Sequence, residues 1–159
     1  MTKRFALCGL LLSMLVTTAT AESTIFIVRH GERADSSNDS DLSVAGRARA
    51  EALAKMLSDA KITAIYGTEF KRTQQTAAPL AKALGITVTT VQLKDKDALV
   101  AKLRALNGNA LVVGHGNTIP DLVKALGISE PINIGENDYD NLFEIVLEEK
   151  PKLIRLHYH

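Results

Sequence analysis

Two short runs of apolar, largely β-branched residues restrict the fold of this chain more than any other feature of its sequence. They occupy residues 24–28 and 110–113, and in neither run do apolar and polar residues alternate. Continuous apolarity is typical of strands that are buried on both faces, as in a parallel sheet. Between the two runs, apolar residues recur at helical spacing, for example at Ala45, Ala48 and Ala52. We therefore expect strands and helices to alternate along the chain.

The same patterns predict the remaining elements. Strands are expected at 24–28, 64–66, 86–91 and 110–113, helices at 45–57, 71–84, 96–106 and 119–126, and a closing strand pair at 142–147 and 153–158. Ser43 or Asp41 can cap the first helix, and Pro79 is expected to kink the second helix or to mark its start. This order predicts an α/β fold, a three-layer α/β/α sandwich with a mainly parallel sheet and a C-terminal antiparallel edge pair.

Residues 1–21 have the three parts of a secretory signal peptide: a basic start, an apolar run at 5–16 and a final Ala19-Thr20-Ala21. The apolar run is shorter than the roughly 20 residues that a membrane-spanning helix needs. We therefore expect cleavage after Ala21, a periplasmic or secreted protein, and no stable membrane insertion after cleavage; an uncleaved N-terminal anchor is the alternative. Cys8, the one cysteine, lies in this segment, so the single domain expected at 22–159 cannot form a disulfide.

The charge balance narrows the class of partner. Nineteen basic and 18 acidic residues give a net charge of +1, which is too small for the protein as a whole to attract nucleic acid or an anionic membrane. Recognition of an anion must therefore be local. The sequence contains no Walker phosphate loop, dinucleotide fingerprint or Cys-rich metal motif, so cofactor-dependent chemistry is not expected.

A histidine follows each of the two diagnostic strands. RHGER at 29–33 follows the first strand, and GHGNT at 114–118 follows the other. Because ligands of open α/β sheets bind outside the carboxyl ends of the strands, His30 and His115 are expected at one edge of the sheet. Arg29 and Arg72, the latter in the first turn of the helix at 71–84, are expected to join them.

Two imidazoles and two guanidiniums suit a phosphoryl group. Arginine matches phosphate oxygens with two parallel hydrogen bonds, and a neutral imidazole can attack phosphorus when its other nitrogen is held by a hydrogen bond. Gly31 and Gly116 would let such a ligand approach the backbone closely. Asn117 and Thr118 are expected to cap the helix at 119–126 rather than to contact a ligand.

Four sequence blocks resemble the histidine phosphatase superfamily, in its phosphoglycerate-mutase-like branch. In order, they are VRHGE at 28–32, LSVAG at 42–46, KRTQQTA at 71–77 and VVGHG at 112–116. The resemblance implies a phosphoglycerate-mutase-like fold, His30 as the phosphoacceptor, a phosphate pocket completed by Arg29, Arg72 and His115, and no metal.

An acid that protonates the leaving oxygen is needed as well, and the sequence leaves it unassigned. Longer members of the family carry an inserted segment after the third strand that supplies this acid. Asp95 is the nearest counterpart by position, and Asp97, Glu32 and Asp140 are alternatives.

The sequence therefore predicts an exported, metal-independent phosphatase that hydrolyses phosphomonoesters through a phosphohistidine. A phosphomutase and a non-catalytic phosphate-binding module are the alternatives. The expected substrate is a phosphorylated small molecule or envelope component, selected by the loops at 34–41 and 128–140. The sequence makes no prediction about the oligomeric state.

Overall fold

The computed structural model describes residues 22–159. The predicted signal peptide at 1–21, with Cys8, lies outside the described residues. Within 22–159, no helix is both long enough and apolar enough to cross a membrane.

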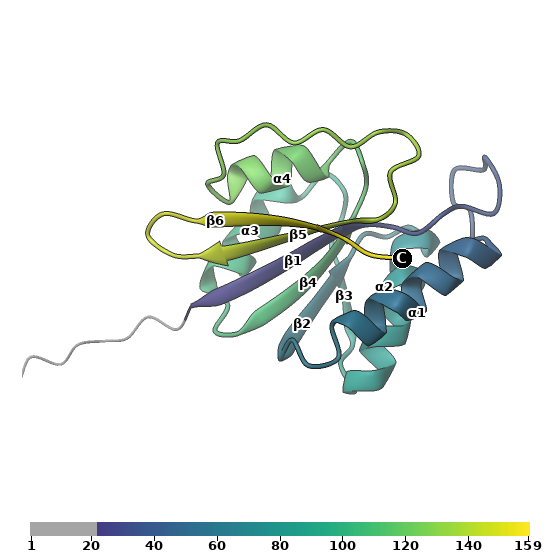
Figure 1. The fold of residues 1–159 in the computed structure, drawn as a ribbon, viewed down its shortest axis with the longest axis horizontal. Helices are drawn as coiled ribbons and strands as arrows, with labels where there is room; N and C mark the ends of the chain where they lie inside the picture. The colour runs from purple at the N-terminus through teal and green to yellow at the C-terminus, as the bar shows by residue number, and fades with distance from the viewer. Residues whose placement is uncertain (1–21) are drawn as a thin grey trace, which may run out of the picture.

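Residues 22–159 form a six-stranded sheet in the order β3-β2-β4-β1-β5-β6 (Figure 1). The strands are β1 (Ser23–Arg29), β2 (Ile62–Gly67), β3 (Val88–Thr90), β4 (Asn109–Gly114), β5 (Asn141–Leu147) and β6 (Lys152–His157). The four strands from β3 to β1 run parallel, whereas β5 pairs antiparallel with β1, and β6 with β5. The predicted parallel sheet with a C-terminal antiparallel edge pair is confirmed.

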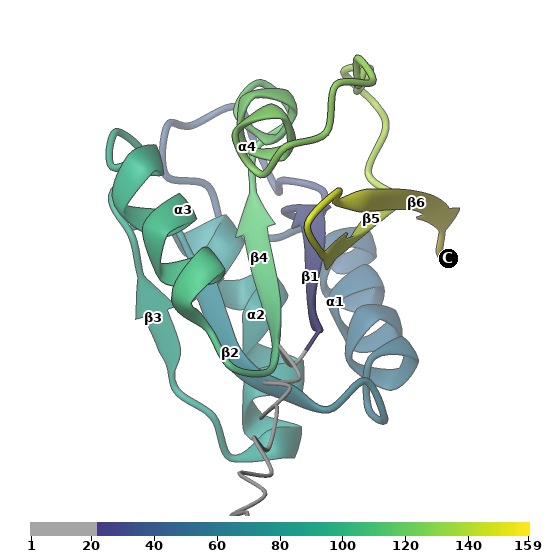
Figure 2. The ribbon, with the colours of Figure 1, turned by 90° about the vertical axis from the view of Figure 1, so that its left-hand side faces the viewer.

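The helices form a layer on each face of this sheet (Figure 2). They are α1 (Val44–Met56), α2 (Lys71–Leu84), α3 (Lys96–Ala105) and α4 (Ile119–Ala125). One buried cluster joins the sheet to α1 and α2, and a second joins it to α3 and α4. The predicted three-layer sandwich is therefore confirmed as well.

Strand β1 shows why a continuous apolar run belongs at the centre of such a sheet. Ile25 and Ile27 point into the cluster beneath α3 and α4, whereas Phe26 and Val28 point into the cluster beneath α1 and α2. All four side chains are buried. Burying one such side chain contributes roughly 1.5–3 kcal/mol, so a polar residue at any of these positions would be costly.

Helix α2 has the bounds predicted from the sequence, Lys71–Leu84, whereas strand β3 is shorter than the strand predicted at 86–91. The helix begins at Lys71 and continues through Pro79, so the proline does not mark its start. Its first turn forms earlier, where the main-chain N–H groups of Thr73 and Gln74 donate to the Phe70 carbonyl. Strand β3 begins later than expected because the N–H of Ile86 donates to the Ala81 carbonyl and so closes the end of α2.

The start of α1 is pressed against the segment that follows β1. The Ser43 hydroxyl caps the helix by accepting from the N–H of Gly46 at 3.0 Å. A Cβ on Gly31 would lie 2.8 Å from the Gly46 carbonyl oxygen, and a Cβ on Gly46 would collide with the Glu32 backbone. Only glycine at both positions allows the two backbones to lie this close.

This contact predicts that Gly46→Ala destabilises the protein although alanine is the better helix former. We expect the free energy of unfolding to fall by about 1–3 kcal/mol, because the added methyl group must push the Glu32 carbonyl away. Urea denaturation measures the change. Glu51→Ala, at an exposed position of the same helix, is the control and should change stability by less than about 0.5 kcal/mol. A Gly46→Ala protein as stable as the wild type would contradict the close contact.

Candidate active site

The carboxyl ends of β1 and β4 bring the two histidines together. These strands are parallel neighbours with Arg29 opposite Gly114, and the N–H of His30 donates to the Gly114 carbonyl at 3.0 Å. The ring centroids of His30 and His115 are 5.2 Å apart. The chain leaves β1 for α1 on one face and reaches β4 from α3 on the other, so the pair lies where the sheet connections diverge, the usual position of a ligand site.

A hollow of about 440 Å³ opens at this edge of the sheet, and we call it the strand-end hollow. Its lining residues are Arg29, His30, Arg33, Arg72, His115, Gly116, Asn117, Ile134, Gly135 and Glu136. Five residues that the sequence assigned to the site are among them: Arg29, His30, Arg72, His115 and Gly116. Gly31 is not, because its N–H donates to Thr76 and its Cα faces α1.

His30 is held as a neutral imidazole with one nitrogen unused. Its side chain is 4% exposed, and Nδ1 lies 2.8 Å from the Gly31 carbonyl oxygen, which can only accept. Nδ1 therefore carries the hydrogen, and the lone pair remains on Nε2. The pKa of His30 is lowered from 6.5 to about 4, mainly by burial and also by the charges of Arg72 and Arg29, although the Gly31 hydrogen bond acts to raise it.

His115 is neutral for a similar reason. Its Nδ1 lies 3.3 Å from Nη2 of Arg72, a group that can only donate, so Nδ1 accepts and Nε2–H donates to the Thr68 hydroxyl at 2.9 Å. Burial, followed by the charges of Arg72 and of His30, lowers the pKa of His115 from 6.5 to about 3. Both rings thus remain uncharged at neutral pH.

The two arginines are held at their tips by main-chain carbonyls. Nη1 of Arg72 donates to Asn38 at 2.7 Å, and Nη1 of Arg29 donates to Gly135 at 3.1 Å and Glu136 at 2.7 Å. Within 22–159, the buried Nε atoms of both arginines have no hydrogen-bond partner. A buried donor without a partner costs about 1–3 kcal/mol, and an anion in the hollow would supply one.

Gly116 keeps one of these donors accessible. A Cβ at this position would stand 3.4 Å from Nε of Arg29 and 3.5 Å from its Cζ. A methyl group there would cover the guanidinium on the side of the hollow. The sequence predicted that Gly116 lets a ligand approach the backbone. In the structure, its missing side chain leaves the Arg29 guanidinium accessible.

Helix α2 is fastened to both histidine segments by threonines. The Thr76 hydroxyl accepts from the N–H of Gly31 at 2.9 Å and donates to the Arg72 carbonyl at 2.7 Å. The Thr73 hydroxyl lies 2.9 Å from that of Thr68, which in turn accepts from His115. The KRTQQTA block therefore positions the site as well as supplying Arg72.

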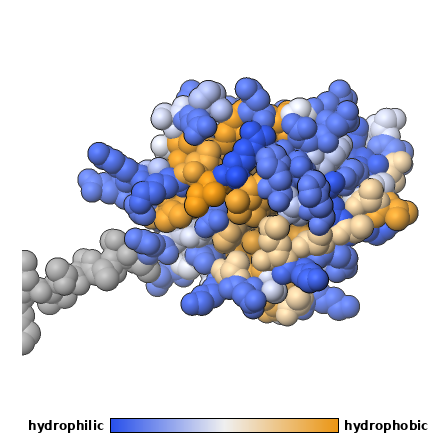
Figure 3. Space-filling view, in the orientation of Figure 1, coloured by the Kyte–Doolittle hydropathy of each residue, from blue (hydrophilic) through white to orange (hydrophobic). Residues whose placement is uncertain are grey.

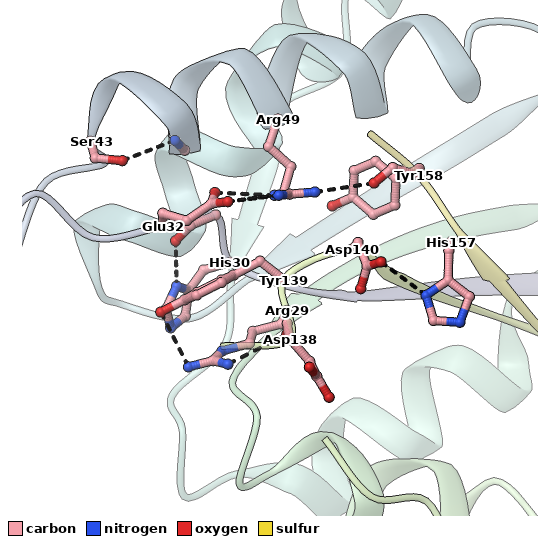
Figure 4. Close-up of polar contacts among 12 residues, drawn as sticks. Arg29, His30, Glu32, Ser43, Arg49, Asp138, Tyr139, Asp140, His157 and Tyr158 are labelled. Atoms are coloured by element: carbon pink, nitrogen blue, oxygen red, sulfur yellow. Dashed lines mark hydrogen bonds and ion pairs between the residues drawn. The ribbon is translucent and has the colours of Figure 1, made fainter. Parts of the chain in front are cut away.

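None of the four acids considered from the sequence lines the strand-end hollow. Glu32 faces α1, where Arg49 binds its carboxylate at 2.7 Å and also donates to the Tyr158 carbonyl at 3.1 Å (Figure 4). The Asp140 carboxylate lies 3.0 Å from Nδ1 of His157. Asp95 and Asp97 lie at the start of α3.

Five lining residues were not assigned to the site from the sequence: Arg33, Asn117, Ile134, Gly135 and Glu136. Asn117 and Thr118 were both expected to cap α4; Thr118 occupies the capping position, without a side-chain capping hydrogen bond. For Ile134, Gly135 and Glu136, the one signal in the sequence was the length of the loop at 128–140. No residue pattern reveals that this loop binds Arg29. Figure 4 shows two of these contacts, from Arg29 to the Asp138 carbonyl and to the Tyr139 hydroxyl.

A second hollow, of about 270 Å³, lies between the sheet and helices α3 and α4. Its lining is mainly apolar, with Tyr66, Val112 and Leu122 among its members, and includes neither histidine nor arginine. Across residues 22–159, no group of three or more His, Cys, Asp and Glu side chains is arranged to hold a metal ion. The chemistry is therefore concentrated in the strand-end hollow.

Comparison with known proteins agrees with this fold. The model of the histidine phosphatase superfamily (branch 1) matches residues 25–95. No curated protein matches the sequence. The fold is similar to that of mycobacterial glucosyl-3-phosphoglycerate phosphatase in a complex with VO3, with a TM-score of 0.69 and 14% identity over 86% of this chain and 99% of that chain. It is also similar to the protein histidine phosphatase SixA complexed with tungstate, with a TM-score of 0.69 and 22% identity over 84% and 96% of the two chains.

The lowered pKa values of the two histidines predict that acid destabilises the protein well above the range in which carboxylates protonate. Below pH 6.5, histidines of the unfolded chain bind protons, whereas His30 and His115 in the folded protein stay neutral down to about pH 4 and about pH 3. The unfolded state then binds more protons, so the free energy of unfolding falls as pH falls through this window.

Urea denaturation at pH 7 and pH 5.5 tests this expectation. The wild type should lose stability between the two, and the double variant His30→Asn, His115→Asn should lose clearly less. An equal loss in both proteins would mean that the histidines titrate normally in the folded state.

Proposed function

Since the chain belongs to the histidine phosphatase superfamily, we propose that it hydrolyses phosphomonoesters through a phosphohistidine on His30. One observation carries the proposal: a neutral imidazole with an unused Nε2 lies in the same hollow as two arginines that have unpartnered donors. A nucleophile and a set of phosphate-binding donors are the two requirements of this chemistry.

In the first step, Nε2 of His30 attacks phosphorus and the bond from phosphorus to the leaving oxygen breaks. The hydrogen bond from Nδ1–H to the Gly31 carbonyl supports the positive charge that the ring acquires. The guanidiniums of Arg29 and Arg72 stabilise the charge on the three remaining oxygens. In the second step, water attacks phosphorus, the bond to Nε2 breaks, and inorganic phosphate leaves with His30 again neutral.

The oxyanions bound in two of the similar structures support this assignment. VO3 and tungstate are stand-ins for a phosphoryl group, and they accompany the mycobacterial phosphatase and SixA, respectively. The two proteins act on different substrates by name, a phosphorylated sugar acid and a protein histidine. The fold therefore supports phosphatase chemistry and leaves the substrate to the loops around the hollow.

The N-terminal sequence supports a site of action outside the cytoplasm. We propose that residues 1–21 direct export and that the substrate is a phosphorylated small molecule or a phosphorylated envelope component. The near-zero net charge of the chain fits a substrate that is recognised at the hollow alone rather than by a charged surface.

Hydrolysis of an aryl phosphate in the presence of a chelator tests the proposed function. The wild type should turn over, and His30→Asn should lose at least about 10³-fold in kcat. His157→Asn, which changes an exposed histidine outside the hollow, is the matched control and should keep full activity. A rapid quench should capture an acid-labile phosphoryl group on the peptide that holds His30.

Three results would contradict the proposal, each in a different way. Chelator-sensitive turnover would indicate a metal-dependent reaction. Transfer of phosphate between phosphoglycerates without release of inorganic phosphate would indicate a phosphomutase. Tight binding of inorganic phosphate by a folded protein without turnover of any phosphomonoester would indicate a binding module.

A further inference from the structure

The proposed hydrolysis requires a proton donor, and neither the histidines nor the arginines of the strand-end hollow can serve as one. An ester of an ordinary alcohol leaves as an alkoxide unless an acid protonates its oxygen as the bond breaks. Arginine does not release its protons, and the protons of His30 and His115 are engaged with Gly31 and Thr68. The donor must therefore be another group that reaches the strand-end hollow.

Among the described residues that line this hollow, Glu136 is the one carboxylic acid. Its side chain is exposed, and within 22–159 its carboxyl group forms neither a hydrogen bond nor an ion pair. Glu32 and Asp140, by contrast, are engaged by Arg49 and His157. Glu136 is thus free to rotate toward a bound ester.

The backbone of Glu136 is fixed although its side chain is not. Its carbonyl accepts from Nη1 of Arg29 at 2.7 Å. The preceding residue is held in a turn, because the N–H of Gly135 donates to the Asp138 carboxylate at 2.8 Å and the N–H of Asp138 donates to the Gly135 carbonyl at 3.1 Å. The arginine that lines the phosphate site therefore also sets the position of the acid.

The depth of the two residues suits opposite ends of an in-line displacement. Both residues line the hollow, but His30 is 4% exposed whereas Glu136 is exposed, so we take the His30 side as the floor of the hollow and the Glu136 side as its rim. When Nε2 of His30 attacks from the floor, the leaving oxygen must depart on the far side of phosphorus, toward the rim.

We propose that Glu136 is the general acid of the reaction, an inference that rests on the proposed function. As Nε2 of His30 bonds to phosphorus, the bond from phosphorus to the leaving oxygen breaks and its electron pair stays on oxygen. The carboxyl proton of Glu136 moves to that oxygen, so a neutral alcohol leaves. The Glu136 carboxylate then takes a proton from the water that attacks the phosphohistidine, which restores the acid.

Comparing two leaving groups tests this role. Glu136→Gln keeps the size and polarity of the side chain and removes its proton. The measured quantity is kcat/KM, which reports the steps up to breakage of the ester bond. For glycerol phosphate, whose alkoxide needs a proton, we expect a fall of about 10²- to 10⁴-fold. For 2,4-dinitrophenyl phosphate, whose phenolate leaves unaided, we expect a change of less than about threefold, because no proton is required.

Glu130→Gln is the matched control, since Glu130 is an exposed acid of the same loop that does not line the hollow. This variant should keep the wild-type kcat/KM for both esters. Two results for Glu136→Gln would overturn the assignment: an unchanged kcat/KM for glycerol phosphate, or a fall in kcat/KM of the same size for both esters. A purely structural role would affect both esters alike. If the wild type hydrolyses neither ester, the proposed function fails and the acid assignment fails with it; if only the leaving-group difference is missing, the function stands and Glu136 is excluded.

Discussion

Positive charge gathered around two buried imidazoles is the constraint on which the rest of the site depends. Arg29, Arg33 and Arg72 line the same hollow as His30 and His115. The positive charges of the three guanidiniums repel one another, and burial adds a desolvation cost for each charged side chain. The protein limits this cost in two ways: the histidines stay neutral, and main-chain carbonyls rather than carboxylates hold the arginine tips. A carboxylate in their place would neutralise the charge that an anionic ligand needs.

The fold can hold this arrangement because the parallel strands end side by side in a rigid core. Apolar residues on both faces of β1 and β4 fix the two strand ends, and the contact of Gly31 with Gly46 fixes the segment that follows His30. Arg49 joins Glu32, which lies two residues beyond His30, to the carbonyl of Tyr158 near the C-terminus. The face of the molecule seen in Figure 3 is mixed, with polar side chains beside apolar ones.

Much of this could be predicted from the sequence, and the remainder has a physical reason. Continuous apolar runs and helical spacing predicted the layers and the sheet, because these patterns report burial directly. Arg29, His30, Arg72 and His115 could be brought to one edge because parallel strands align their carboxyl ends. The sequence could not show that Glu136 lines the hollow or that Arg49 binds Glu32. Both contacts depend on where a loop and the chain end fold back onto residues that are distant in sequence. The acid considered nearest by position, Asp95, begins a helix instead.

The hydrogen bonds from Arg29 to the loop at 128–140 have an evolutionary consequence. Its guanidinium binds the carbonyl oxygens of Gly135, Glu136 and Asp138, which every amino acid possesses. The attachment therefore does not depend on most of the side chains that the loop presents; Asp138, whose carboxylate holds the turn at Gly135, is an exception. Descendants of this chain can exchange loop residues other than Glu136 and Asp138, and with them the range of ligands admitted, while Arg29 keeps its position. A backbone-mediated anchor of this kind leaves most of the loop free to diversify around a preserved centre.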